Sequence, residues 1–126
     1  MEDLIRIGRI SSVNYKDGTA KVAYSDRDDM VTGELPTLAS EYQMPKIDDL
    51  VLVLHLKKGR KGVIIGQIYS DQLRPGITGK DKYYKKLTEK AKMKVENGKL
   101  TIEAKEITFK SDNGSITLDQ IISHIT

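Results

Sequence analysis

KMKVENGKLTIEAKEITFKSDNGSITL, residues 92–118, is the stretch that decides the fold of this chain. Divided into sevens, it gives four short units, each of which opens with apolar residues that alternate with polar ones. Because successive side chains of a β-strand point to opposite faces, this alternation predicts four strands. The alternating apolar pairs are Met93 and Val95, Leu100 and Ile102, Ile107 and Phe109, and Ile116 and Leu118.

The apolar positions change parity from each unit to the next, so each joint must absorb one residue. Asn97-Gly98 and Asn113-Gly114 suit tight turns, because Asn and Gly adopt positive φ angles more readily than other residues. Residues 104–106 carry no turn signal, so we expect a shallow corner there.

Strands of this length bury too little apolar surface to be stable alone. Seven residues span only about 23 Å, and each unit carries about two apolar side chains. Thin sheets are marginal in water, and repeated units bury their cores by stacking on neighbours. Two arrangements are open. One is an ordinary meander packed on its own domain, and the other is a prism in which identical strands from several chains share one apolar axis.

Composition limits the chain to one domain with an extension or a long tail. Of its 126 residues, 38% are hydrophobic and 31% are charged, so a single large core is not expected. The absence of cysteine excludes disulfides and thiolate metal sites and suits a reducing compartment. Net charge is +3, with seven lysines between residues 80 and 94. Such a segment either binds an anionic partner or is a solvated linker, and we favour the linker.

The ends and hydropathy of the chain predict synthesis as a soluble cytoplasmic protein. Its first ten residues lack the basic region and long apolar stretch of a secretion signal. The longest purely apolar run, residues 50–54, is far shorter than the roughly 20 residues that cross a bilayer.

The first 70 residues predict five short strands without a convincing helix. Asp17-Gly18 between alternating segments is a strong hairpin signal, and Gly8 suggests a bulge or a tight bend, as at a barrel corner, in the first strand. Residues 50–56 are apolar on both faces, which predicts a central strand. We therefore expect an all-β chain with an OB-type Greek-key barrel over residues 1–70. A linker over residues 71–91, with weak helical propensity in 81–91, and a β-structured region over 92–126 would follow.

Candidates for chemistry in this region are weak. Asp26, Asp28 and Asp29 could hold a cation, but no calcium-loop spacing supports it, and a solvated hairpin loop is favoured. His55 has no catalytic partner at motif spacing, so we expect a partly buried structural histidine. The basic loop at residues 57–62 lacks the spacing of a phosphate-binding loop and is favoured as a charged turn. No catalytic residues are evident, and we expect no enzymatic activity.

The motifs of the first 70 residues, taken together in their order, resemble a known family. GRISSVNYKDGTAKV, then GELPTL, then PKIDDLVLVLHLKKGRKGVIIGQIY are similar to the N-terminal OB domain of phage baseplate assembly protein V. Its members are the central spikes of contractile tails, with relatives in type VI secretion and R-type bacteriocins. In that family a linker and a trimeric β-helix follow the barrel, which favours the shared-axis prism over the meander for residues 92–126.

This resemblance implies a homotrimeric structural spike that docks on the hub of a phage tail baseplate or bacteriocin and punctures the target cell envelope. The trimer would be assembled into the virion or tail-like particle, with baseplate proteins and, transiently, the envelope as partners. We expect inward-facing side chains along the three-fold axis at Val95, Leu100, Ile102, Ile107, Phe109, Ile116 and Leu118. We expect the trimer to close in a tip formed by Ile121, Ile122, His124 and Ile125.

Two departures from the family matter. The β-helical part is short, which implies a stubby spike. Some family tips hold iron with a His-x-His pair on the axis, whereas this chain has a single tip histidine, His124. We expect no cofactor and no metal, with His124 as the one candidate ligand should three copies meet.

The alternative function is an OB-fold protein that binds single-stranded nucleic acid, with a basic tail. Tyr15, Tyr24 and Tyr69 would stack on bases, and the basic loop would supply charge. This alternative gives residues 92–118 no role, so we expect no nucleic-acid partner. An enzyme is the weakest candidate, because neither histidine has a partner at motif spacing.

Overall fold

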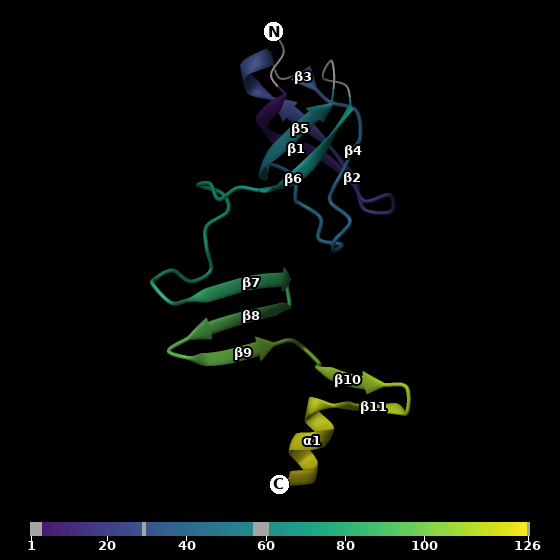
Figure 1. Ribbon diagram of the computed structural model, residues 1–126, viewed down its shortest axis with the longest axis vertical. Coiled ribbons are helices and arrows are strands. Elements are labelled where there is room, and N and C mark those ends of the chain that lie inside the picture. The colour runs from purple at the N-terminus through teal and green to yellow at the C-terminus, as the bar shows by residue number, and fades with distance from the viewer. Residues whose placement is uncertain (1–3, 29, 57–60, 126) are drawn as a thin grey trace. The chain divides into compact units, whose positions relative to one another are not determined.

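A computed structural model describes residues 4–28, 30–56 and 61–125 of the chain (Figure 1). The chain divides into two units, Met1–Arg74 and Pro75–Thr126. Among the described residues the structure is built from β-strands, with one short 3-10 turn and one α-helix of eight residues. The all-β class is therefore confirmed.

The N-terminal unit is a six-stranded antiparallel sheet in the order β3-β2-β1-β5-β6, with β4 also paired to β2. A parallel bridge between Thr37, just after β4, and Ile64 on β6 connects the two ends of this order. The elements are β1 (Ile5–Asn14), β2 (Thr19–Tyr24), the 3-10 turn (Ser25–Arg27), β3 (Met30–Val31), β4 (Leu35–Pro36), β5 (Leu50–Leu56) and β6 (Lys61–Gln67).

The predicted hairpin joins β1 to β2. Gly18 has a φ of 69°, and its amide donates to the carbonyl oxygen of Asn14 at 3.0 Å. The Asn14 side chain also accepts from the amide of Asp17 at 3.1 Å. The expected return strand, residues 19–24, is β2 itself.

β5 is an interior strand, paired with β1 on one side and β6 on the other, while β1 holds the middle of the order. Its two apolar faces differ in burial. Val51 and Val53 are fully buried, whereas Leu54 and Leu56 on the opposite face are exposed. The core of the unit is made by Ile10, Ala20, Val22, Tyr24, Leu35, Val51, Val53 and Ile64.

Of the bulge or tight bend predicted at Gly8, the bulge is not found there, because Gly8 pairs in regular register with Val51. The register of β1 against β2 shifts between Ile10 and Ser12 instead. Gly8 is required for packing, because a Cβ there would lie 2.6 Å from Val22 Cγ1 and 2.7 Å from the Tyr24 ring.

The C-terminal unit contains the four predicted strands of residues 92–118 and one more. β7 (Tyr83–Thr88), β8 (Ala91–Glu96) and β9 (Lys99–Glu103) form an antiparallel sheet. β10 (Thr108–Ser111) and β11 (Gly114–Thr117) form a hairpin, and α1 (Leu118–Ile125) follows.

The turns follow the sequence signals. Asn97 and Gly98 have φ angles of 53° and 76°, so the β8–β9 joint is a tight turn of two residues. In the β10–β11 hairpin Ser111 pairs with Gly114, so Asp112 and Asn113 make the turn. Residues 104–107 connect β9 to β10 outside any strand, at the place of the expected corner.

β7 is a difference from the sequence prediction, because it lies in the range assigned to a linker with weak helical propensity. Tyr83 pairs with Val95, and Lys85 pairs with Met93. β7 contains Tyr83, Tyr84 and Thr88, and Tyr and Thr favour strands. A neighbouring strand overrides the weak local preference here.

α1 is a second difference, because residues 118–125 were not expected to be helical. Thr117 and Gln120 form a reciprocal cap: the amide of Thr117 donates to Gln120 Oε1 at 2.8 Å, and the amide of Gln120 donates to Thr117 Oγ1 at 3.1 Å. This is a capping box, and its Thr-x-x-Gln signature is present in the sequence. No helix among the described residues has the length and hydropathy that crossing a membrane requires.

We expect Gly8→Ala to lower the free energy of unfolding by about 1 to 3 kcal/mol, because the added methyl group must displace Val22 or Tyr24. Gly33→Ala is the control, since no atom lies within 4 Å of its added Cβ. Urea unfolding followed by circular dichroism measures both variants. Equal midpoints for the two variants would contradict the close packing at Gly8.

Candidate functional site

Most of the apolar side chains of the β7–β9 sheet lie on one face, which also carries Lys85, the partner of Met93 on β7. Tyr83 pairs with Val95, which in turn pairs with Leu100, and Met93 pairs with Ile102. Residues directly opposite one another share a face, so these five side chains lie together. We call this set, Tyr83, Met93, Val95, Leu100 and Ile102, the apolar sheet face.

The opposite face carries ion pairs between neighbouring strands and within β8. Lys92 Nζ lies 3.3 Å from Glu103, and Glu96 accepts from Lys82 at 3.1 Å and lies 3.4 Å from Lys94. Hydrogen bonds from Lys82 and then Lys94 hold the pKa of the Glu96 carboxyl below its usual value. These groups are solvated, so the pairs contribute little stability and chiefly keep this face polar.

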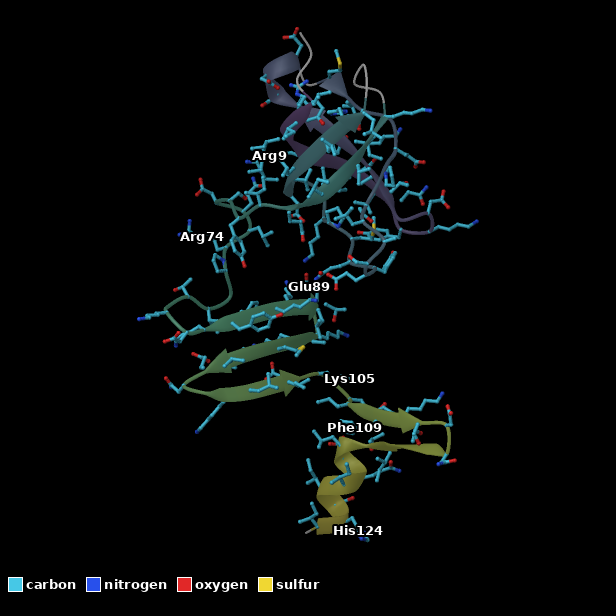
Figure 2. The ribbon with its side chains drawn as sticks, in the orientation of Figure 1. Arg9, Arg74, Glu89, Lys105, Phe109 and His124 are labelled. Carbon is cyan, nitrogen blue, oxygen red and sulfur yellow. The ribbon has the colours of Figure 1, made fainter. Side chains whose placement is uncertain are left out.

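The β10–β11 hairpin presents a smaller apolar surface. Phe109 pairs with Ile116 across the two strands, and both side chains are exposed, Phe109 to 55%. Just beyond the last pair of the ladder, the amide of Leu118 donates to the carbonyl oxygen of Ile107 at 2.8 Å. Figure 2 shows Phe109 on β10 of this hairpin.

α1 carries a narrow apolar stripe. Leu118, Ile121, Ile122 and Ile125 recur at the spacing of one helical face. None is buried, and Ile125 is 77% exposed. His124 lies near the C-terminal end of α1 (Figure 2). At 100° per residue, its position is about 110° from the centre of the stripe.

No described residue of β7–β11 or α1 is buried. Leu100 is 61% exposed and Ile102 is 50% exposed, while Val51 and Val53 of the N-terminal unit are fully buried. Ordered sheets with one continuous apolar face and no core of their own need a partner. The apolar sheet face, the Phe109–Ile116 pair and the stripe of α1 therefore make up the candidate site, which is a candidate interaction surface.

Among the predicted axis residues, Val95, Leu100 and Ile102 share one face, and Phe109 and Ile116 share another. Leu118 belongs to the α1 stripe with the tip isoleucines, and Ile107 is half-buried beside the Leu118 backbone. Sequence reasoning left Tyr83 and Met93 off the axis list. Met93 could have been included, because it alternates with Val95, and Tyr83 was missed together with β7.

His55 is a structural residue, as predicted. It is 3% exposed, and its Nε2 lies 2.6 Å from the hydroxyl of Tyr24, whose ring meets it edge-on. The guanidinium of Arg6 lies 4.1 Å from the centre of the Tyr24 ring and bonds to Asp26 at 2.6 Å. Burial raises the pKa of the Tyr24 hydroxyl above its usual value of about 10, and Arg6 partly offsets this shift.

The remaining candidates of the N-terminal unit form no site. Asp26 is engaged by Arg6, Asp28 is exposed with a φ of 55°, and Asp29 lies outside the described residues. Residues 57–60 of the basic loop also lie outside them. Among the residues that the structure describes, no three His, Cys, Asp or Glu side chains gather to hold a metal ion.

An open hollow of about 480 Å³ lies beside Arg9 and Asp48, but it gathers no reactive groups. The guanidinium of Arg9 is already engaged there, donating to the carbonyl oxygen of Asp48 at 2.9 Å and to Gln72 at 3.2 Å. Tyr15 and Tyr69 are exposed, but Tyr24 is buried. The prediction that Tyr24 can stack on nucleic-acid bases is therefore wrong.

We expect Tyr24 to influence alkaline stability. Since folding raises its pKa, the protonated hydroxyl stabilises the fold below about pH 10, and this contribution is lost as pH rises through the folded pKa. Tyr24→Phe also removes the bond to His55, so at pH 7 it should lower the free energy of unfolding by about 1 to 3 kcal/mol.

Urea unfolding of the wild type, Tyr24→Phe and the exposed control Tyr15→Phe between about pH 9 and pH 11 measures this effect. The wild type and Tyr15→Phe should lose stability more steeply with pH than Tyr24→Phe. Parallel slopes for all three proteins would show that Tyr24 does not titrate differently in the fold.

No family model and no curated protein matches the chain. The resemblance to baseplate spikes therefore depends only on the sequence motifs of the first 70 residues.

Proposed function

We propose that this chain is the homotrimeric central spike of a contractile injection machine, either a phage tail baseplate or a phage-tail-like bacteriocin. The N-terminal unit is an OB-type barrel that docks on the tail hub. The C-terminal unit is an intertwined β-prism that points toward the target envelope. The single observation that carries the proposal is an ordered C-terminal unit whose apolar side chains are not buried within that unit.

The sheet pairing supports an OB-type barrel. β4 pairs with β2, and the Thr37–Ile64 bridge follows it, so the edges of the sheet are brought together. A closed sheet has no long free edge, which suits a domain that must not aggregate through strand pairing.

The dimensions of the β7–β9 sheet favour three copies. Strands of five or six residues span about 17–20 Å. If three such sheets form the sides of a triangular prism, each sheet lies about 5–6 Å from the central axis. Packed sheets are about 10 Å apart, so side chains of this size fill such a prism. Four walls would lie about 9–10 Å from the axis and leave a void, which packed interiors avoid.

The stripe of α1 also favours a trimer. In heptad numbering, Leu118 and Ile125 occupy the first position (a) and Ile121 the fourth (d). This choice of residues favours bundles of three or four helices over two. An isolated eight-residue helix is marginal in water, so packing against its copies explains why it forms. The three copies would close the tip, as the isoleucines predict.

The proposed mechanism is mechanical and uses no catalytic group. Contraction of a sheath would drive the spike into the envelope, and stiffness would come from shared apolar packing of three chains. The alternative, a single-stranded nucleic-acid binder, is less well supported, because Tyr24 is buried and the apolar faces of the C-terminal unit would have no purpose.

Ile102→Glu should abolish the trimer, because three unpaired carboxylates would be placed at the axis at a cost of several kcal/mol each. Thr101→Glu is the matched control, since Thr101 pairs with Lys94 on the charged face. Light scattering after gel filtration measures the mass, given 14.1 kDa per chain.

The wild type and Thr101→Glu should have the mass of three chains, and Ile102→Glu the mass of one. A monomeric wild type would refute the spike, and a mass of two chains would favour a two-fold sandwich of the sheets. A trimer that survives Ile102→Glu would place the axis elsewhere.

His124 should not hold a metal, because packing about the α1 stripe turns its side chain away from the axis. Elemental analysis of the purified trimer should find substoichiometric metal. The melting temperature of His124→Ala should match the wild type with and without chelator. One metal ion per three chains, lost in His124→Ala, would contradict this expectation.

A further inference from the structure

The guanidinium of Arg9, on β1 of the N-terminal unit, is oriented through one of its terminal nitrogens (Figure 2). Arg9 pairs with Leu50 on β5 and with Ala23 on β2. Its Nη1 donates to the carbonyl oxygen of Asp48 at 2.9 Å and to Oε1 of Gln72 at 3.2 Å. Because Nη1 carries two hydrogens, these two acceptors use both of them and fix the plane of the guanidinium.

The two acceptors are themselves held by hydrogen bonds. The amide of Asp48 donates to the carbonyl oxygen of Ile10 at 2.8 Å, which fastens this loop to β1. Gln72 lies in a turn closed by backbone bonds of 3.0 and 3.2 Å between Ser70 and Leu73, and its amide donates to Ser70 Oγ at 3.2 Å. The guanidinium is therefore positioned before any ligand arrives, which lowers the entropic cost of binding.

The donors that Arg9 has left form one edge of the guanidinium. Among the residues that the structure describes, none accepts a hydrogen bond from Nε or Nη2 of Arg9, and both groups bonded to Nη1 are neutral. The hydrogens on Nε and Nη2 are parallel and match the two oxygens of one carboxylate. The fork between Nη1 and Nη2 is blocked, so only the edge through Nε remains for an anion.

Arg9 lines an open hollow of about 480 Å³, a volume within the range of small-ligand sites. The aliphatic part of its lining comes from Ala23, Ile47 and Leu50. Ile47 is 62% exposed, so its side chain is available to cover an apolar group of a ligand. The hollow therefore combines an oriented cation with an apolar wall, which suits an acidic residue beside an aliphatic one.

The charge of the lining selects among anions. Arg9 and Asp48 are its charged members, and Asp48 contacts the guanidinium through its backbone carbonyl only. The Asp48 carboxylate repels a phosphate dianion more than a carboxylate with a single charge. We propose that this hollow binds an aspartate or glutamate side chain of a partner protein, with Nε and Nη2 of Arg9 donating to its two oxygens. The site does not depend on the proposed trimer.

The test is a titration of the full-length protein, labelled with heavy nitrogen, followed by NMR. The probe is an acetylated and amidated Leu-Asp-Leu peptide, compared with Leu-Asn-Leu and with inorganic phosphate. The Nε–Hε signal of Arg9 is identified by its loss in Arg9→Lys, and the amide signal of Leu50 follows binding in every variant. Arg74→Lys is the matched control, because Arg74 is an exposed arginine that lies 3.6 Å from its own carboxylate, Asp71.

We expect Leu-Asp-Leu to shift the Arg9 signal with half-saturation at about a millimolar, and Leu-Asn-Leu to bind about tenfold more weakly because it lacks the charge. Arg9→Lys should weaken binding of Leu-Asp-Leu about tenfold, since lysine has no planar fork. Arg74→Lys should bind as the wild type does. Asp48→Asn keeps the backbone carbonyl that orients Arg9 and removes a like charge, so it should tighten binding about two- to fivefold.

Equal binding of the two peptides, or no binding of either, would overturn the site. Unchanged affinity in Arg9→Lys would also overturn it, because a charge without the fork would then suffice. Phosphate that binds at lower concentration than Leu-Asp-Leu would assign the hollow to phosphate groups instead. If Arg9→Lys does not fold, the comparison of the wild type with Asp48→Asn decides, since equal affinities would contradict an anion bound in the hollow.

Discussion

The apolar face of the β7–β9 sheet is the constraint on which the rest of the molecule depends. One face of this three-stranded sheet carries five apolar side chains beside Lys85, while the other carries lysine–glutamate pairs. The sheet therefore cannot be stable as a solvated single layer. The apolar side chains of that face are exposed in the described chain, and in the proposed trimer identical copies would cover them.

The two units meet this constraint differently. The N-terminal sheet packs around its own core. Because Gly8 has no side chain, Val22 and Tyr24 can pack against its backbone, and the Tyr24 hydroxyl forms a hydrogen bond with His55. Its stability is local to one chain. The C-terminal unit has turns and a helix cap of good geometry but no buried residue among those described, so its secondary structure is specified locally, and the proposed trimer would supply its apolar packing.

Sequence patterns predicted what depends on local geometry. Asp17-Gly18 and Asn97-Gly98 marked hairpins because their residues tolerate positive φ, and both turns are present. β7 was missed because four of the seven lysines between residues 80 and 94 lie in β7 and β8 and resemble a solvated linker until the partner strand is known. The sequence did not predict which side of β5 is buried. Residues 50–56 are apolar on both sides, so no local signal distinguishes buried Val51 and Val53 from exposed Leu54 and Leu56.

Charge is arranged so that solubility and association do not compete. Lys92 and Lys94 point away from the apolar sheet face and pair with Glu103 and Glu96, so the charged side of the sheet stays polar. Such pairs add little stability, but they discourage stacking of the outer side on other molecules. In the proposed spike the interior would supply cohesion and the charged exterior would keep the rod from adhering before it is driven forward. A rod with the reverse arrangement would aggregate before it could assemble.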